Sequence, residues 1–146
     1  MVLEIKTFDE LETRELYQIL QLRSEVFVVE QNCVYQDMDD KDYSALHIIG
    51  IRNNGVMAYT RVFKPGDYFK EASIGRVVVK KAERGYGYAS HIMEYSLKAI
   101  SDRFGPVPVR ISAQKYLMDF YNSLGFVKKG NEYLEDGIPH IAMLRK

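Results

Sequence analysis

Residues 74–93 read Ile-Gly-Arg-Val-Val-Val-Lys-Lys-Ala-Glu-Arg-Gly-Tyr-Gly-Tyr-Ala-Ser-His-Ile-Met. The β-branched residues before Lys80 favour an extended strand. Gly85 and Gly87 then allow a turn in which several backbone N–H groups can converge on one ligand. A helix beginning near Tyr88 would add unpaired N–H groups and the positive end of its dipole, which suit a phosphate. The stretch therefore predicts a strand, an anion-binding turn and a helix.

Three phosphate-binding patterns compete for this turn, and their spacing separates them. A P-loop needs Lys and then Ser or Thr after its last glycine, whereas Gly87 is followed by Tyr88 and Ala89. The dinucleotide-binding pattern needs a third glycine where this chain has Ser90. The acyl-CoA pattern Gln/Arg-x-x-Gly-x-Gly/Ala fits at Arg84, Gly87 and Ala89. At this turn the chain resembles the GNAT acetyltransferase superfamily.

A second motif extends the resemblance. In that superfamily a later strand leads into a helix with an Asn, then a Tyr, then a Gly-Phe ending. The corresponding residues here are Gln114, Tyr121, Gly125 and Phe126, with Gln in place of the Asn. Residues 22–39 and 135–143 are similar to the ElaA branch of the superfamily. The resemblance therefore covers nearly the whole chain.

Composition limits the possible classes of protein. With 146 residues, of which 47% are apolar and 27% charged, we expect a single domain spanning residues 1–146. The net charge is zero and Lys and Arg are scattered, which argues against a nucleic-acid partner. No apolar run reaches the roughly 18 residues of a membrane span and the start lacks a signal-peptide layout, so we expect a cytoplasmic protein with no membrane contact. Cys33 is the only cysteine, which excludes an internal disulfide and disfavours a metal site.

Hydropathy patterns and turn residues predict the order of elements. Strands are expected at 2–7, at 46–51, at 56–63, in a stretch that ends at 79, and at 107–112. A final hairpin is expected over 126–144, with its turn at Asp136-Gly137. Helices are expected after a capping box at Asp9 and Glu12, then over 88–104 and 116–124. Residues 31–44 are expected to form a structured loop.

This order predicts an α+β (mixed α/β) fold with a mixed sheet and helices on both faces. The resemblance implies more, namely the GNAT acyl-CoA N-acyltransferase fold. In that fold the central twisted sheet is mostly antiparallel, and its fourth and fifth strands splay apart to form the cleft that admits acyl-CoA.

The resemblance also implies an activity. An acetyl-CoA-dependent N-acetyltransferase of this kind moves the acetyl group directly to a primary amine of a small molecule or peptide, with no metal. The residues expected to hold the donor are Val77, Val78 and Val79 through their backbone, together with Arg84, Gly85, Tyr86, Gly87, Tyr88, Ala89, Ser90 and Gln114.

Tyr121 is the expected general acid. A phenol of pKa about 10 stays protonated at neutral pH and can donate to a thiolate whose thiol has a pKa of about 8.5. The base that deprotonates the amine depends on the acceptor, because a lysine-like amine of pKa about 10.4 needs far more help than an α-amino group near 8. Glu30 and His47 are the leading candidate bases, with Glu135 and His140 as alternatives.

The acceptor pocket is expected among the first helix, the loop after it, the hairpin that begins at Leu46 and the final hairpin. The expected substrate-binding residues are Arg23, Phe27, Gln31, Arg76 and His140. We expect Arg76 to orient the acceptor, with an ion pair to a loop aspartate as the alternative. Mixed charge in this region favours a small polar or zwitterionic amine. The pattern leaves open whether the protein is a monomer or a homodimer.

Two other functions fit part of the pattern. Arg23, Phe27, Asp39 and Asp42 are also similar to acyl-homoserine-lactone synthases, although those enzymes carry a tryptophan near the position of Cys33 and this chain has none. A non-catalytic acyl-CoA-sensing or protein-binding module would keep the turn at 84–89 without needing a phenol later in the chain. Replacing that phenol would therefore remove turnover only if the protein is an enzyme.

Overall fold

Eight strands form one sheet in the computed structural model, which describes residues 1–146. Their order is β1-β2-β3-β4-β5-β8-β6, and β7 also pairs with β8. All pairings are antiparallel except that of β4 with β5. The strands are β1 (Val2–Thr7), β2 (Leu46–Arg52), β3 (Gly55–Phe63), β4 (Ala72–Val79), β5 (Val109–Gln114), β6 (Val127–Lys128), β7 (Tyr133–Glu135) and β8 (Ile138–Arg145).

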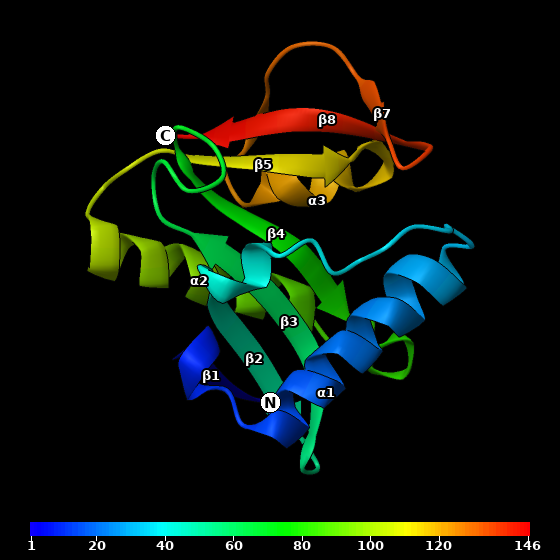
Figure 1. Ribbon diagram of the computed structural model, residues 1–146. Helices are drawn as coiled ribbons and strands as arrows, with labels where there is room; N and C mark the ends of the chain where they lie inside the picture. The colour runs from blue at the N-terminus through cyan, green and yellow to red at the C-terminus, as the bar shows by residue number, and fades with distance from the viewer.

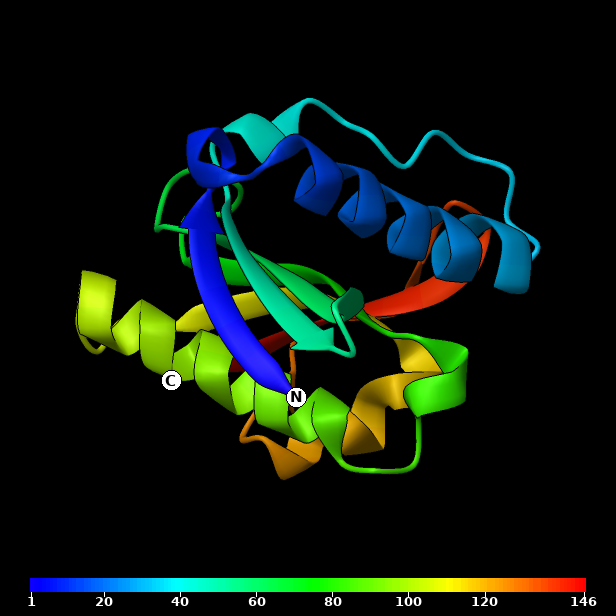
Figure 2. The same ribbon diagram turned by 90° about the horizontal axis from the view of Figure 1, so that it is seen from below.

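Helices cover both faces of this sheet. The three α-helices are α1 (Thr13–Arg23), α2 (Tyr88–Phe104) and α3 (Met118–Ser123), and a π-helical segment (Ser24–Glu30) continues α1. Seen from below, α1 lies on one side of the strands and α2 and α3 lie on the other (Figure 2). No helix is both long enough and apolar enough to cross a bilayer. The architecture confirms the expected mixed sheet of the GNAT fold.

Two apolar cores result from the alternation of side chains along the strands. On the α1 side, Ile19, Leu22 and Val26 pack with Ile49 and Val78. The larger core lies on the side of α2 and α3. It includes Ile48 and Val79, which are next in the chain to Ile49 and Val78, because successive residues of a strand face opposite sides of the sheet. The buried residues of this second core include Ile48, Val79, Ile92, Met93, Ile100, Ile111 and Met143.

The sheet opens between β4 and β5, as the resemblance implied. Only Ala72 and Ser73 of β4 pair with β5, and beyond them the two strands separate (Figure 1). On its other edge, β4 has a register shift against β3 between Tyr59 and Arg61. Arg76 lies opposite this shift and has a φ of +49°, which is a strained value for a non-glycine residue. The extra residue of such a bulge bends the strand, and here it accompanies the divergence from β5.

The start of α1 differs from the prediction. The expected capping box at Asp9 and Glu12 is wrong, because a 3-10 turn (Phe8–Glu10) comes first. The backbone N–H of Thr7 donates to the Glu10 carboxylate at 2.9 Å, and that of Glu12 donates to Glu15 at 2.9 Å. Each carboxylate satisfies a backbone donor at the start of a helical turn, so α1 begins at Thr13.

The C-terminal elements also differ in their bounds. β5 extends to Gln114, because this residue still pairs with β8 at His140. The single helix expected over 116–124 is divided into a 3-10 turn (Lys115–Leu117) and α3. The expected two-stranded hairpin contains three strands, and its predicted turn at Asp136 and Gly137 is confirmed by their φ values of +51° and +77°.

Candidate active site

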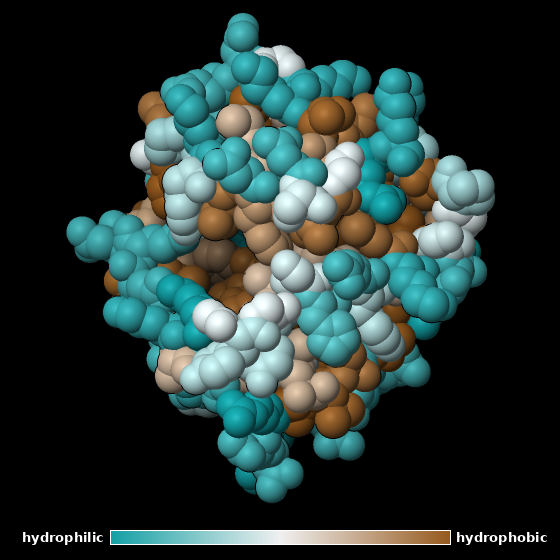
Figure 3. Space-filling model, turned by 180° about the vertical axis from the view of Figure 1, so that it is seen from behind, coloured by the Kyte–Doolittle hydropathy of each residue, from teal (hydrophilic) through white to brown (hydrophobic).

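A cavity of about 450 Å³ lies between the separated ends of β4 and β5. Its walls are mainly apolar, with 18 hydrophobic residues among the 30 that line it. The view from behind shows a hollow with largely apolar walls, bordered on its left and lower sides by hydrophilic side chains (Figure 3). Such a cavity can hold an apolar arm of a ligand while a few polar groups set its orientation.

The glycine turn lies at one end of this cavity. Gly85 and Gly87 have φ values of +91° and +78°, and a Cβ added at either would meet no atom within 4 Å. The glycines are therefore required by backbone conformation rather than by close packing, and the space before the start of α2 is open to a ligand. Arg84 donates from Nε to the Val79 carbonyl at 3.0 Å, which ties the turn to the end of β4. This arrangement fits a phosphate-bearing ligand whose arm follows β4.

The backbone of β4 offers fewer free groups than the sequence suggested. The N–H of Lys80 donates to the carbonyl of Met57 on β3 at 2.8 Å. Because backbone groups alternate sides along a strand, Val78 points its N–H to β3, whereas Val77 and Val79 point theirs to the cleft. Two of the three valines, not all three, can therefore donate to a ligand.

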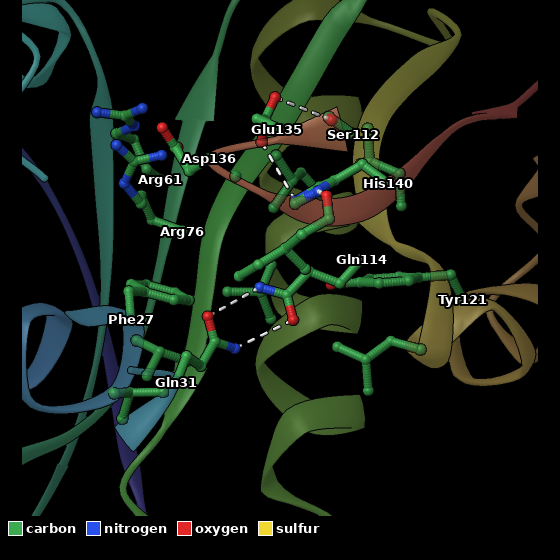
Figure 4. A pocket seen from close by; sticks show the side chains of 18 of the residues that line it. Phe27, Gln31, Arg61, Arg76, Ser112, Gln114, Tyr121, Glu135, Asp136 and His140 are labelled. Carbon is green, nitrogen blue, oxygen red and sulfur yellow. Dashed lines mark hydrogen bonds and ion pairs between the residues drawn. The ribbon is translucent and has the colours of Figure 1, made fainter. Parts of the chain in front are cut away.

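Tyr121 places a phenol hydroxyl in the cavity (Figure 4). The residue is 6% exposed, and its hydroxyl makes no hydrogen bond within the protein. Its ring packs edge-on against Phe120 and Phe126 on α3 and just after it. Burial raises the pKa of the Tyr121 hydroxyl. The hydroxyl therefore stays protonated at neutral pH and remains free to donate to a ligand.

Two glutamines meet at the cavity. The side-chain amides of Gln31 and Gln114 exchange hydrogen bonds of 3.0 and 3.1 Å (Figure 4). Gln31 follows the π-helical segment, and Gln114 ends β5. The sequence analysis placed Gln114 among the residues that bind acetyl-CoA and Gln31 among those that bind the amine. The structure brings the two side chains into one contact.

Glu30 and Arg84 also bind each other. Arg84 donates to the two Glu30 carboxylate oxygens at 2.6 and 3.0 Å. The hydrogen bond from Arg84 is the main cause of the lowered pKa of Glu30. A carboxylate held in its ionised form in this way is a poor proton acceptor, which contradicts the expectation that Glu30 is the base.

His47 does not line the cavity. Its Nδ1 lies 2.5 Å from the Tyr59 hydroxyl, and its Nε2 donates to the carbonyl of Asp42 at 2.9 Å. Burial lowers the pKa of His47, so the ring is neutral with both nitrogens engaged. This geometry contradicts the expectation that His47 acts as a base.

Arg23 is not a substrate-binding residue either. It is fully buried, where its Nε donates to Asp37 at 2.7 Å and its NH1 donates to Asp42 at 2.8 Å. It belongs to a set of six ion-paired residues that we call the buried charge network. The network consists of Arg23, Asp37, Asp39, Asp42, Arg61 and Arg76.

The other two arginines of the network reach the cavity wall. Arg61 binds both oxygens of Asp39, at 2.8 and 2.9 Å. Burial alone would raise the pKa of Asp39, but the hydrogen bonds and charge of Arg61 lower it to about 2. Arg76 donates to a side-chain oxygen of Asp37 at 2.8 Å and to its carbonyl at 2.9 Å. For Arg76 the alternative of an ion pair to a loop aspartate is therefore confirmed.

A histidine and a glutamate face each other across the β7–β8 hairpin. His140 donates from Nδ1 to the Ile138 carbonyl at 2.7 Å, and its Nε2 lies 3.2 Å from a Glu135 oxygen (Figure 4). Ser112 donates to the other oxygen of Glu135 at 3.3 Å. With its Nδ1–H donated to a carbonyl, His140 directs Nε2 toward the Glu135 carboxylate. The imidazole nitrogen and the carboxylate are therefore positioned side by side at the cavity.

Phe27 lines the cavity as expected, whereas Ser112 and Asp136 line it without having been predicted. Strand periodicity could have indicated Ser112, because it lies two residues from Gln114 and so shares its face of β5. The sequence carried no such signal for Asp136, which was identified only as a turn residue. Nowhere do three or more His, Cys, Asp or Glu side chains gather in a way that could hold a metal ion.

Comparisons with known proteins agree with this fold. The protein-family model for the acetyltransferase (GNAT) domain matches residues 9–146. Protein ElaA of Escherichia coli is 43% identical over 139 residues, which cover 94% of this chain and 91% of that protein. The crystal structure of E. coli ElaA covers 99% of both chains with a TM-score of 0.93. A crystal structure of an acyl-CoA N-acyltransferase from Pseudomonas aeruginosa is 40% identical, with a TM-score of 0.94 over 100% of both chains.

Proposed function

Since this chain belongs to the GNAT acetyltransferase family and is an acyltransferase, we propose that it moves an acetyl group from acetyl-CoA directly to a primary amine of a small polar molecule or peptide. The observation that carries the proposal is the Tyr121 hydroxyl, which is buried in the cavity without a partner. The same cavity is lined by Arg84 and Ala89 of the glycine turn and by the Glu135–His140 pair. A cytoplasmic location, where a single cysteine stays reduced, belongs to the same proposal.

The donor would be held by the turn and by β4. Gly85, Gly87 and the first N–H groups of α2 would bind its phosphates, and the N–H groups of Val77 and Val79 would bind its arm and polarise the thioester carbonyl. Acetyl-CoA, when bound, would supply an activated acetyl carbon whose C–S bond breaks as the amine nitrogen forms the new C–N bond.

The chain itself supplies two proton sites. Tyr121 holds a proton on its hydroxyl oxygen and can give it to the leaving sulfur. The Glu135–His140 pair can take the proton that the amine loses, because the Nε2 lone pair of His140 has no competing donor. We therefore propose this pair as the base in place of Glu30 and His47.

Thermal stability with and without acetyl-CoA tests the proposal. At about 100 times its dissociation constant, specific binding should add about 2.7 kcal/mol. A Gly87→Val variant should lose this shift, because the side chain would occupy the open space before α2. Gly130→Val is the matched control, since Gly130 has a similar φ of +85° and an equally open surrounding but lies between β6 and β7 rather than in the turn before α2.

An amine screen that detects the released thiol follows the binding test. Turnover with at least one amine, lost when acetyl-CoA is withheld, would support the proposal. An absence of any shift at millimolar acetyl-CoA, in folded protein free of carried-over CoA, would contradict it.

A further inference from the structure

The arginines that line the cavity are all engaged by carboxylates. No lysine lines it, so three arginines are the only permanently charged cations in its wall. The pairs are Arg84 with Glu30, Arg61 with Asp39, and Arg76 with Asp37. Within the buried charge network, three arginines face three aspartates, so the network adds no net charge. The cavity wall therefore offers a ligand no uncompensated positive charge.

The lining carboxylates that lack an arginine or lysine partner are Glu135 and Asp136. Glu135 lies within ion-pair distance of His140 alone, and Asp136 makes no ion pair at all. Burial raises the pKa of the Tyr68 hydroxyl, and the charge of Glu135 raises it further. The pKa of the Tyr35 hydroxyl is raised mainly by burial and by the charge of Asp37, and to a smaller extent by the charge of Asp136. The part of the cavity that Glu135 and Asp136 line, which we call the acceptor half, therefore contains carboxylates that no lining arginine or lysine neutralises.

Two further cations lie near this half but outside the lining. The Lys41 ammonium lies 5.2 Å from the centre of the Tyr68 ring, and the Arg110 guanidinium lies 5.1 Å from that of Phe69. The rings of Tyr68 and Phe69 line the cavity, whereas the two cations do not. The walls that a ligand meets here are aromatic faces, and these suit a chain of methylene groups.

We infer that the acceptor is a small amine that carries a second cationic group and no carboxylate, and that Asp136 is the residue that selects it. This inference rests on the proposed function and specifies its acceptor. The second ammonium would form a charge-assisted hydrogen bond with Asp136, while the reacting amine lies at the Glu135–His140 pair. A carboxylate on the acceptor would instead be repelled by the carboxylates of Glu135 and Asp136. The sequence analysis also considered a zwitterionic acceptor, but its carboxylate would need a free cation, and Arg76 is engaged by Asp37.

The test compares three amines of equal chain length. They are 1,4-diaminobutane, 4-aminobutanoate and butylamine, whose far ends are cationic, anionic and neutral. With acetyl-CoA as donor, kcat/KM should be about tenfold or more higher for the diamine than for 4-aminobutanoate, the effect expected of one charge-assisted hydrogen bond.

Asp136→Asn should lower kcat/KM for the diamine about tenfold and leave that for butylamine unchanged. Asn tolerates the φ of +51° at this turn, so the hairpin should be retained. Glu132→Gln is the matched control, because it changes the net charge equally but removes a carboxylate that pairs with Lys115 and does not line the cavity. This control should leave all three values unchanged.

Two results would overturn the inference while acetyl transfer itself stands. One is a kcat/KM for 4-aminobutanoate that equals or exceeds that for the diamine, and the other is an unchanged preference in Asp136→Asn. If protein that binds acetyl-CoA acetylates no amine, the proposed function fails, and calorimetric titration of the same compounds decides on the charge of the ligand. In that titration, equal affinities would overturn the inference, and diamine binding that Asp136→Asn weakens would support it.

Discussion

The buried charge network and the active-site cavity use the same kinds of side chains, yet they differ in how completely those side chains are partnered. In the network every charged group has an opposite charge within reach, and Arg23 and Arg61 are almost fully buried. In the cavity the Tyr121 hydroxyl has no hydrogen-bond partner and Asp136 has no ion-pair partner. The two regions meet at the cavity wall, where Arg61 and Arg76 belong to both.

This difference distinguishes polar side chains that stabilise the fold from polar side chains that remain available to a ligand. A polar group whose partner lies within the protein contributes to folding, and its pKa is adapted to that partner. A group without a partner keeps its hydrogen-bonding capacity for a ligand. Arg23 and His47 were predicted to take part in binding or catalysis from residue type and position, and the structure assigns them to the first kind.

Removal of Arg23 should have the largest effect. Arg23→Met leaves Asp37 and Asp42 buried without their shared cation, so we expect a loss of about 3–5 kcal/mol in the free energy of unfolding. Urea denaturation followed by circular dichroism measures it. The control is Arg52→Met, since Arg52 forms an exposed pair with Glu83 at 2.6 Å and such pairs contribute at most about 1 kcal/mol. If both variants lost the same free energy of unfolding, the buried charge network would stabilise the protein no more than an exposed ion pair does.

Tyr121→Phe should come next and should affect activity alone. We expect kcat to fall about 10²–10³-fold, because a positioned acid contributes on this scale. The free energy of unfolding should not fall, since the hydroxyl forms no hydrogen bond that could be lost. Steady-state kinetics, acetyl-CoA affinity and urea denaturation together provide the comparison.

Tyr116→Phe serves as the control for this variant. Tyr116 also lines the cavity, but it is 72% exposed, and its loss should change kcat little. A Tyr121→Phe enzyme with unchanged kcat would show that the unpartnered hydroxyl is not the acid.

The pH dependence of stability should report the buried groups. Burial lowers the pKa of His47, so the unfolded chain gains a proton below about 6.5 that the folded chain does not take up, and stability should decline from there. Asp39 has a pKa of about 2 in the fold. Its contribution is therefore complete above about 3.8 and is lost as the pH falls toward 2. Urea denaturation across pH 8 to 2 would resolve the two declines, and a His47→Gln variant should lack the first.

Glu30→Gln should have the smallest effect. Glu30 forms a partly exposed pair with Arg84, so we expect less than about 1 kcal/mol of lost stability and a kcat close to that of the wild type. His140→Gln, in contrast, should lower kcat about 10²-fold if the Glu135–His140 pair is the base. A fall in kcat for Glu30→Gln as large as that for His140→Gln would restore Glu30 as the base.

The parts of the site that could be predicted are those set by local sequence. The positive φ values of Gly85 and Gly87 and the turn at Asp136-Gly137 follow from residue type within a few positions. Tyr121 was found because a family motif fixes its distance from Gln114 along the chain. The bulge at Arg76 was missed, because nothing in its neighbours requires a positive φ there and the bulge depends on the register against β3.

Most of the strand and helix order and the glycine turn could be read from the sequence alone, because periodicity and backbone conformation depend on residues close together in the chain. The family was recognised from its motifs. Which polar groups are satisfied depends on the tertiary structure. Gln31 meets Gln114 across 83 positions, and Arg84 meets Glu30 across 54. Such pairs depend on distances between elements that the chain brings together only when it folds, and those distances decide whether a polar side chain stabilises the protein or remains free to act on a ligand.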